Sequence, residues 1–212
     1  QIRSILDRQG IVWPSGKRGW TKEQGRQLEQ MSLSWAKAQP QARWRCMLGE
    51  ELRALRDAEE RQERVTDRLD RMGQHDPAIQ RLRTIPGVGP RLAETVVACL
   101  DDPHRFKSGK AVGCYAGLTP RQFQSGSMNR IGRISGMGNR LLRSLLVEIS
   151  WLGMRHNPWM RQVYEQTLRG CAVRKKVAIV AVARRLLIRC WAMLRDGSAW
   201  DPNRHCAVCP AS

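Results

Sequence analysis

The chain has 212 residues and a formal net charge of +18, and this charge is distributed unevenly along it. Residues 1–102 hold 18 Lys and Arg against 15 Asp and Glu, whereas residues 103–212 hold 19 against 4. The second half therefore has the electrostatic footprint of a nucleic-acid-binding protein, with an anionic membrane surface as the competing partner. No run of about 18 apolar residues occurs, so a transmembrane helix is not expected.

The first 40 residues predict two short helices separated by a loop. Ile2 and Leu6 have helical spacing, and the glycines and prolines that follow them predict the loop. Thr21, with Gln24 three residues later, predicts the start of the second helix through a capping box. Because the sequence begins without Met, we expect residues 1–40 to continue from an N-terminal domain upstream of it.

Residues 41–76 are expected to form a helical arm. Apolar side chains recur at near-heptad spacing from Met47 to Met72, and a dense face of mixed charge lies between them. Such spacing favours a long helix that pairs in a hairpin or a coiled coil. The charged face is either a solvated surface or the flank of a self-association interface, and the sequence leaves both open.

Two helical stretches flank the sequence TIPGVGP at residues 84–90. A short helix, a Gly-x-Gly turn and a second helix beginning at Pro90 are typical of a helix-hairpin-helix. Glycines let such a turn lie flat on a sugar-phosphate backbone, and the amides of the following helix face a phosphate. We therefore predict Gly87, Val88 and Gly89 as contacts to a nucleic-acid backbone that do not specify base sequence. The alternative is an ordinary Gly-Pro connector.

The stretch from Pro103 to Val147 contains no Asp or Glu. It predicts a short helix over residues 110–115, a short strand at residues 122–124, and a helix from Asn139 to about Gly153. Arginines alternate with glycines through most of this stretch. Arginine matches the geometry of phosphate, and glycine lets the backbone approach it closely.

Three serines, Ser125, Ser127 and Ser135, lie among these arginines. A serine that attacks a phosphodiester needs nearby cations to stabilise the developing charge. Serines in glycine-rich loops also cap turns or bind phosphate without reacting, and the residues alone leave these roles open. The sequence shows no acidic triad, no P-loop and no GxSxG elbow, so a self-contained metal nuclease is not expected.

Two further helices are predicted, over residues 158–168 and from Lys175 to about Arg195. Basic residues are frequent in this region, and we predict Lys175 and Lys176 as contacts to nucleic acid. Residues 204–212 form a predicted tail.

Cysteine usage predicts free thiols. Seven scattered cysteines fit a reducing compartment better than a disulfide framework. Cys206 and Cys209 form a lone CxxC, but the sequence has no second pair of ligands to complete a zinc site. No metal-ligating residues are therefore predicted in this chain.

Several motifs occur in one order: IPGVGP at residues 85–90, YAGLTPR at 115–121, QSGS at 124–127 and RISGMGNRLLR at 133–143. With these motifs, residues 80–203 resemble the C-terminal domain of the insertion-sequence 110 (IS110) family of bacterial transposases. Members of that family join this domain to an N-terminal RuvC-like DEDD domain. They use a structured RNA from their own element to choose the DNA on which they act.

The resemblance implies a mainly α fold in which residues 77–203 form the transposase domain. It implies Ser125 as a nucleophile that attacks DNA and forms a covalent phosphoserine linkage during strand exchange, with Ser127 as the nearest alternative. Polar and basic side chains around it are assigned to nucleic-acid contact from their charge and proximity: Arg121, Arg130, Arg133, Asn139 and Arg140.

The resemblance also implies DNA, both element ends and target, and a guide RNA as partners. It implies a dimer or a tetramer, and a location in the bacterial cytoplasm near the nucleoid. Mg²⁺ is expected only with the DEDD domain, whose acids are not visible in this sequence, so we expect the chain to bind nucleic acid without recombining it unaided. The alternative function is a non-catalytic nucleic-acid-binding fragment of a truncated transposase, and a structural RNA chaperone is a weaker one.

Overall fold

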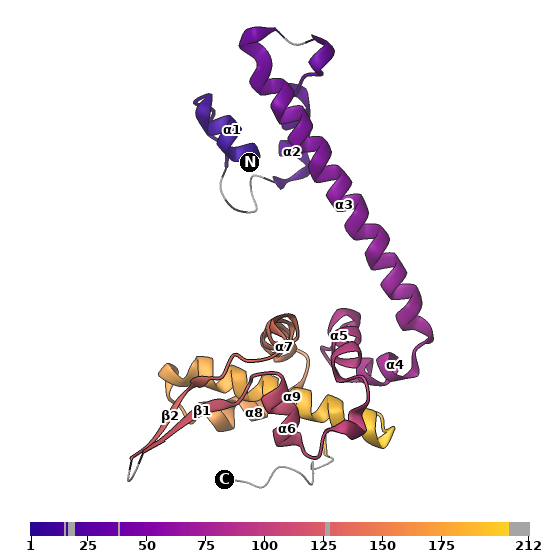
Figure 1. The fold of residues 1–212 in the computed structure, drawn as a ribbon, viewed down its shortest axis with the longest axis vertical. Helices are drawn as coiled ribbons and strands as arrows, with labels where there is room; N and C mark the ends of the chain where they lie inside the picture. Colours follow the sequence, from indigo (N-terminus) through magenta and orange to yellow (C-terminus); the bar gives the residue numbers. More distant parts are fainter. Residues whose placement is uncertain (15, 17–19, 38, 126–127, 204–212) are drawn as a thin grey trace. The chain divides into compact units, whose positions relative to one another are not determined.

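The computed structural model describes residues 1–14, 16, 20–37, 39–125 and 128–203, with the backbone alone for residues 37, 122–125 and 128–131. Helices dominate this part of the chain, which confirms the expected mainly α fold (Figure 1). The chain divides into two compact units, Gln1–Leu69 and Asp70–Ser212. None of the helices in the described part is long and apolar enough to cross a membrane.

The first unit is built from α1 (Ile2–Arg8), α2 (Lys22–Met31) and the N-terminal part of α3 (Arg43–His75). Two single-turn 3₁₀ helices, η2 (Trp35–Lys37) and η3 (Pro40–Ala42), join α2 to α3. Buried aliphatic side chains from the three α-helices form its core: Ile2, Leu6, Leu28, Leu48 and Leu52. Burial of this apolar surface is the main force that holds the three helices together.

Local sequence signals set the ends of these helices. Thr21 is the N-cap of α2, and its Oγ1 accepts a hydrogen bond from the backbone N–H of Gln24 at 3.4 Å. The start that the capping box predicted is therefore confirmed. The helix predicted within residues 41–76 is present as α3, on which Val65 and Met72 are 54% and 66% exposed. The coiled coil stays a prediction.

The second unit contains the remaining elements. These are α4 (Pro77–Arg83), α5 (Pro90–Leu100), η4 (Pro103–Arg105), α6 (Gly109–Tyr115), β1 (Pro120–Ser125), β2 (Met128–Ile134), α7 (Arg140–Gly153), α8 (Pro158–Leu168), η5 (Ala172–Arg174) and α9 (Lys175–Asp196). The predicted helices at residues 110–115, 139–153, 158–168 and 175–195 are therefore confirmed to within one or two residues at either end.

Helix α9 is the centre of the second unit. It packs against α4, α5, α6, α7 and α8, and Leu186, Leu187 and Trp191 are fully buried on it. The Trp191 Nε1–H donates to the carbonyl of Pro103 at 2.7 Å, so the one polar atom of this buried ring is satisfied. This bond also ties η4 to the core.

Two features differ from the sequence expectations. The strand predicted at residues 122–124 is present within β1, but its partner β2 was not predicted. On α7, Leu141 and Leu152 have the helical spacing expected of an apolar face, yet they are 59% and 51% exposed. Periodicity marks a stripe of apolar residues, and the packing of α5 and α9 on α7 covers only part of that stripe.

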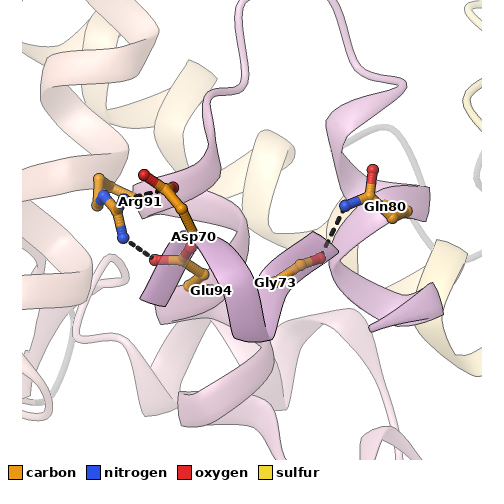
Figure 2. Close-up of polar contacts among 5 residues, drawn as sticks. All are labelled: Asp70, Gly73, Gln80, Arg91 and Glu94. Atoms are coloured by element: carbon orange, nitrogen blue, oxygen red, sulfur yellow. Dashed lines mark hydrogen bonds and ion pairs between the residues drawn. The ribbon is translucent and has the colours of Figure 1, made fainter. Parts of the chain in front are cut away.

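The last turns of α3 are fastened to α4 and α5 (Figure 2). Arg91 on α5 bridges Asp70 at 2.5 Å and Glu94 at 2.7 Å, and Gln80 Nε2 donates to the carbonyl of Gly73 at 2.7 Å. A Cβ on Gly73 would lie 3.2 Å from Glu94 Oε1, so glycine permits the close approach. We call these five residues the polar clamp: Asp70, Gly73, Gln80, Arg91 and Glu94. The clamp includes the first residues of the second unit.

Candidate nucleic-acid interface

The β ribbon, β1 with β2, carries the predicted nucleophile. The strands are antiparallel, and Ser125 at the end of β1 pairs with Met128 at the start of β2. Arg130 pairs with Phe123, two residues before Ser125 on the same strand. Figure 1 shows the ribbon extending away from the helices of the second unit. Ser127, the alternative nucleophile, lies outside the described residues.

The base of the ribbon is a close crossing of two backbone segments. A Cβ on Gly117 would overlap the carbonyl oxygen of Met137, and one on Gly138 would overlap that of Tyr115. Ser135 N–H donates to the carbonyl of Thr119 at 2.8 Å, which adds a hydrogen bond across the crossing. Because the segments cannot separate or slide without breaking these contacts, the ribbon leaves the helical core in a defined direction.

Of the predicted arginines, Arg121, Arg133 and Arg140 have side chains that the structure describes, whereas for Arg130 it describes the backbone alone. Arg121 is exposed and its Nη2 donates to the carbonyl of Ser135 at 2.9 Å, across the base of the ribbon. Arg133 on β2 and Arg140, the first residue of α7, are exposed. Arg143, which was not among the predicted contacts, donates to the carbonyl of Ala116 at 3.1 Å. Thus Arg121 and Arg143 help to hold the ribbon base together, while Arg133 and Arg140 are exposed.

Asn139 has an internal role. Its Oδ1 accepts from the N–H of Leu142 at 3.1 Å as the N-cap of α7, and its Nδ2 lies 3.2 Å from Cys99 Sγ on α5. Partial burial raises the pKa of the Cys99 thiol, which keeps it in the neutral form beside this amide. Asn139 therefore joins the start of α7 to the end of α5, and its place among the nucleic-acid contacts stays a prediction.

The α4–α5 turn, residues 84–89, lies where the helix-hairpin-helix was predicted. Val88 is buried, and its N–H donates to the carbonyl of Ile85 at 3.0 Å. Gly87 has φ +88, and a Cβ there would lie 2.9 Å from Gly153 Cα at the end of α7. A Cβ on Gly89 would meet nothing within 4 Å. Gly87 is thus required by internal packing, whereas Gly89 lies on the open side of the turn.

Helix α5 begins at this turn with its first amides uncapped by any described side chain. Gly89 is the N-cap and Pro90 the first residue. Pro90 has no N–H, and the following amides of the first turn have no acceptor within the helix. An uncapped helix N-terminus carries partial positive charge and suits an anion such as a phosphate.

Asn157 supports the turn from its inner side, and it was not among the predicted site residues. It is buried, its Oδ1 accepts from the N–H groups of Trp159 and Met160 as the N-cap of α8, and its Nδ2 donates to the carbonyl of Pro86 at 3.1 Å. The Asn-Pro pair at residues 157–158 signals a helix start. Only the fold brings it to the turn.

Lys175 and Lys176 are exposed at the start of α9. Positive charge at a helix N-terminus opposes the helix dipole, and the first turn of α9 contains no acid to offset it. A bound polyanion would remove this penalty. The two lysines thus suit phosphate binding better than they suit helix stability.

The turn and the ribbon base lie at opposite ends of α7. Asn139 begins that helix beside Cys99, and Gly153 ends it beside Gly87. A helix of 14 residues rises about 21 Å. The structure therefore places Arg121 and Arg133 near the base of the ribbon and the backbone of Ser125 at its tip, and it places Gly87–Gly89 at the other end of the α5–α7 pair.

Metal chemistry has no evident ligand set in this part of the chain. Among the described residues, no group of three or more His, Cys, Asp or Glu side chains is placed to hold a metal ion. Cys206 and Cys209 lie outside the described residues. The described residues therefore provide no ligand set for the Mg²⁺ that the resemblance associates with a DEDD domain.

In comparison with known proteins, one family model matches a segment that contains both the α4–α5 turn and the β ribbon. Residues 79–165 match the family model described as Transposase IS116/IS110/IS902 family. This range includes the α4–α5 turn, the ribbon and α7.

Three relatives show how far the similarity extends. A "Probable family 20 transposase" of Pseudomonas aeruginosa is 29% identical over 96% of this chain and 60% of its own length. A "Putative transposase y4rJ" of Sinorhizobium fredii is 34% identical over 57% of this chain and 31% of its own length. A "Pilin gene-inverting protein" of Moraxella bovis is 33% identical over 58% of this chain and 39% of its own length. The chain thus spans 60% or less of each of these proteins.

Proposed function

We propose, on the premise that residues 79–165 of this chain belong to the Transposase IS116/IS110/IS902 family, that the second unit binds DNA for transposition. The observation that carries the proposal is the open, uncapped start of α5 at the α4–α5 turn, inside the matched segment. Amides of that helix take a backbone phosphate, and Lys175 and Lys176 with the ribbon arginines neutralise others. These contacts hold DNA without choosing its sequence.

The salt dependence of DNA binding tests this proposal. The logarithm of the binding constant should fall steeply with the logarithm of salt concentration, and Lys175→Ala should reduce the slope by about 1. Lys22→Ala is the matched control, because Lys22 is also an exposed first residue of a helix, in the first unit. A flat salt response would argue against DNA binding by the second unit. Equal effects of Lys175→Ala and Lys22→Ala would argue against it as well.

Ser125 is the proposed nucleophile for strand exchange. In that step its Oγ forms a bond to phosphorus and loses its proton, while the bridging oxygen leaves as a free strand hydroxyl, so the phosphodiester is exchanged. Guanidinium groups around the ribbon stabilise the charge on the phosphorane. Ser125→Ala in a full-length transposase that carries this sequence should abolish covalent protein–DNA adducts and leave DNA binding intact.

A structured guide RNA is part of the same proposal. It would occupy basic surface of the second unit, and its competition with duplex DNA for binding tests this.

Self-association is also part of the proposal. It would use α3, whose Val65, Leu69 and Met72 are exposed at coiled-coil spacing. Leu69→Glu should then lower the sedimentation coefficient, and an unchanged coefficient would argue against association through α3.

A non-catalytic nucleic-acid-binding protein remains the second candidate function. Gly87 and Asn139 have internal packing roles, so these two motif residues do not distinguish the two candidates. The two candidates differ in one result: only the transposase forms a covalent adduct with DNA.

A further inference from the structure

The segment that follows α9 folds back onto the α4–α5 turn. Helix α9 ends at Asp196, and the backbone N–H of Trp200 donates to Oγ1 of Thr84 at 3.0 Å. Thr84 is both the C-cap of α4 and the first residue of the turn. A residue from the far end of the described chain therefore fixes the beginning of the proposed DNA-binding turn.

Aromatic and cationic contacts anchor this segment. The Trp200 ring meets the Trp159 ring of α8 edge to face, with centroids 5.3 Å apart. The guanidinium of Arg189 on α9 lies 5.4 Å from the Trp200 centroid and 5.5 Å from that of Trp159. Arg189 Nη2 also donates to the carbonyl of Pro202 at 3.5 Å. Aromatic and cation–π contacts of this kind are attractive, so the segment is held at more than one point.

The hydroxyl of Thr84 is used twice. It donates to the carbonyl of Arg81 at 2.7 Å, in the last turn of α4, and it accepts from Trp200. With Asn157 on the carbonyl of Pro86 and Gly153 against Gly87, this gives the turn three supports on its inner side. The outer side keeps Gly89 and the start of α5 open.

Backbone amides bind a phosphate well only when they already have the bound geometry, because ordering them on binding costs free energy. We propose that residues 198–203 act as a strap that pre-organises the α4–α5 turn for a phosphate, with Trp200 and Thr84 as positioning residues. This inference rests on the proposed DNA-binding function of the turn, and it assigns the strap no contact with DNA.

Threonine-to-valine substitutions test the strap. Thr84→Val keeps the shape of the side chain but removes the acceptor for Trp200. Thr95→Val is the matched control, because the Thr95 hydroxyl donates to the carbonyl of Arg91 at 2.7 Å within α5. Thr84→Ser retains the hydroxyl and should behave like the unaltered protein.

Affinity for a duplex of about 20 base pairs is measured together with amide hydrogen exchange. Relative to Thr95→Val, Thr84→Val should bind about 3- to 10-fold more weakly, the loss expected for one hydrogen bond. In Thr84→Val without DNA, the rate of amide hydrogen exchange should increase between Ile85 and Leu92, and it should stay unchanged in α9. Trp200→Ala should have the same two effects, and Trp200→Phe should restore both.

The outcomes separate the two proposals. If the unaltered protein shows no salt-dependent DNA binding, the proposed function fails and the strap proposal fails with it. If that protein binds DNA and Thr84→Val matches Thr95→Val in affinity, the strap proposal alone is overturned. Faster exchange throughout α9 in Thr84→Val would also overturn it, because the strap would then support the whole core and not the turn.

Discussion

Gly117 and Gly136 have nearly the same backbone conformation, φ +68 and +66, in different surroundings. At Gly117 a Cβ would overlap the carbonyl oxygen of Met137, whereas at Gly136 a Cβ would meet nothing within 4 Å. A comparison of these two glycines therefore distinguishes two costs in stability. One is the cost of a left-handed conformation, and the other is the cost of moving the two backbone segments apart at the ribbon base.

Alanine at the two positions should give different losses of stability. Gly136→Ala should cost about 1 kcal/mol, the penalty for a left-handed alanine. Gly117→Ala adds the overlap with Met137 and should cost more than about 3 kcal/mol. Denaturant unfolding of the two variants measures the difference. Equal losses would mean that the crossing relaxes easily and does not fix the ribbon.

The polar clamp joins two elements, the last turns of α3 and helix α5, through contacts that are partly buried. Arg91, Asp70 and Glu94 lie between the end of α3 and α5, and the Glu94 side chain is only 12% exposed. Glu94 Oε1 is buried and has no hydrogen-bond partner among the described residues. Removing the arginine would leave this carboxylate partly buried without its nearest cation, which is costly.

Arg91→Ala should therefore lower the free energy of unfolding by about 1–3 kcal/mol. Arg64 provides the control, because it pairs with Glu60 on the same helix at 3.7 Å with both side chains mostly exposed. Arg64→Ala should change stability by less than about 0.5 kcal/mol. Hydrogen exchange of the last turns of α3 should rise in Arg91→Ala alone. Similar behaviour of the two variants would show that the clamp is an ordinary surface ion pair.

Elements with local signals were predictable from the sequence. Thr21, Asn139 and Asn157-Pro158 mark helix starts, and the apolar spacing of α9 marks its buried side. Strand β2 was missed because its apolar residues recur every third position, whereas a half-buried strand alternates, and because its pairing with β1 includes a register shift.

Contacts between distant parts of the chain explain what was missed at the candidate site. The sequence located the turn and Ser125, but the reason for Gly87 is its contact with Gly153. Likewise, Asn157 and Trp200 support the turn from other elements, and no local pattern connects them with it. Periodicity and capping describe one element at a time, whereas these roles depend on how elements pack.

On the scale of the second unit, the two proposed DNA contacts are about 21 Å apart along α7, a distance of about six base pairs. A duplex shorter than this reaches the turn or the ribbon base, but not both. Affinity and salt slope should therefore increase as a duplex grows from about 6 to 12 base pairs, and then level off. Titrations with duplexes of increasing length measure this. A slope independent of length would indicate a single contact site.

The central claim is that Ser125 exchanges a DNA phosphodiester within an arginine-bearing ribbon. The most direct test traps the covalent adduct of a full-length transposase that carries this sequence, then digests it with nuclease and trypsin. Cleavage at arginine releases Ser125 and Ser127 together in the peptide from Gln122 to Arg130, and Ser135 in the peptide from Ile134 to Arg140. We expect a nucleotide mass on Ser125. A nucleotide on Ser127 or Ser135, or no adduct on either peptide, would contradict it.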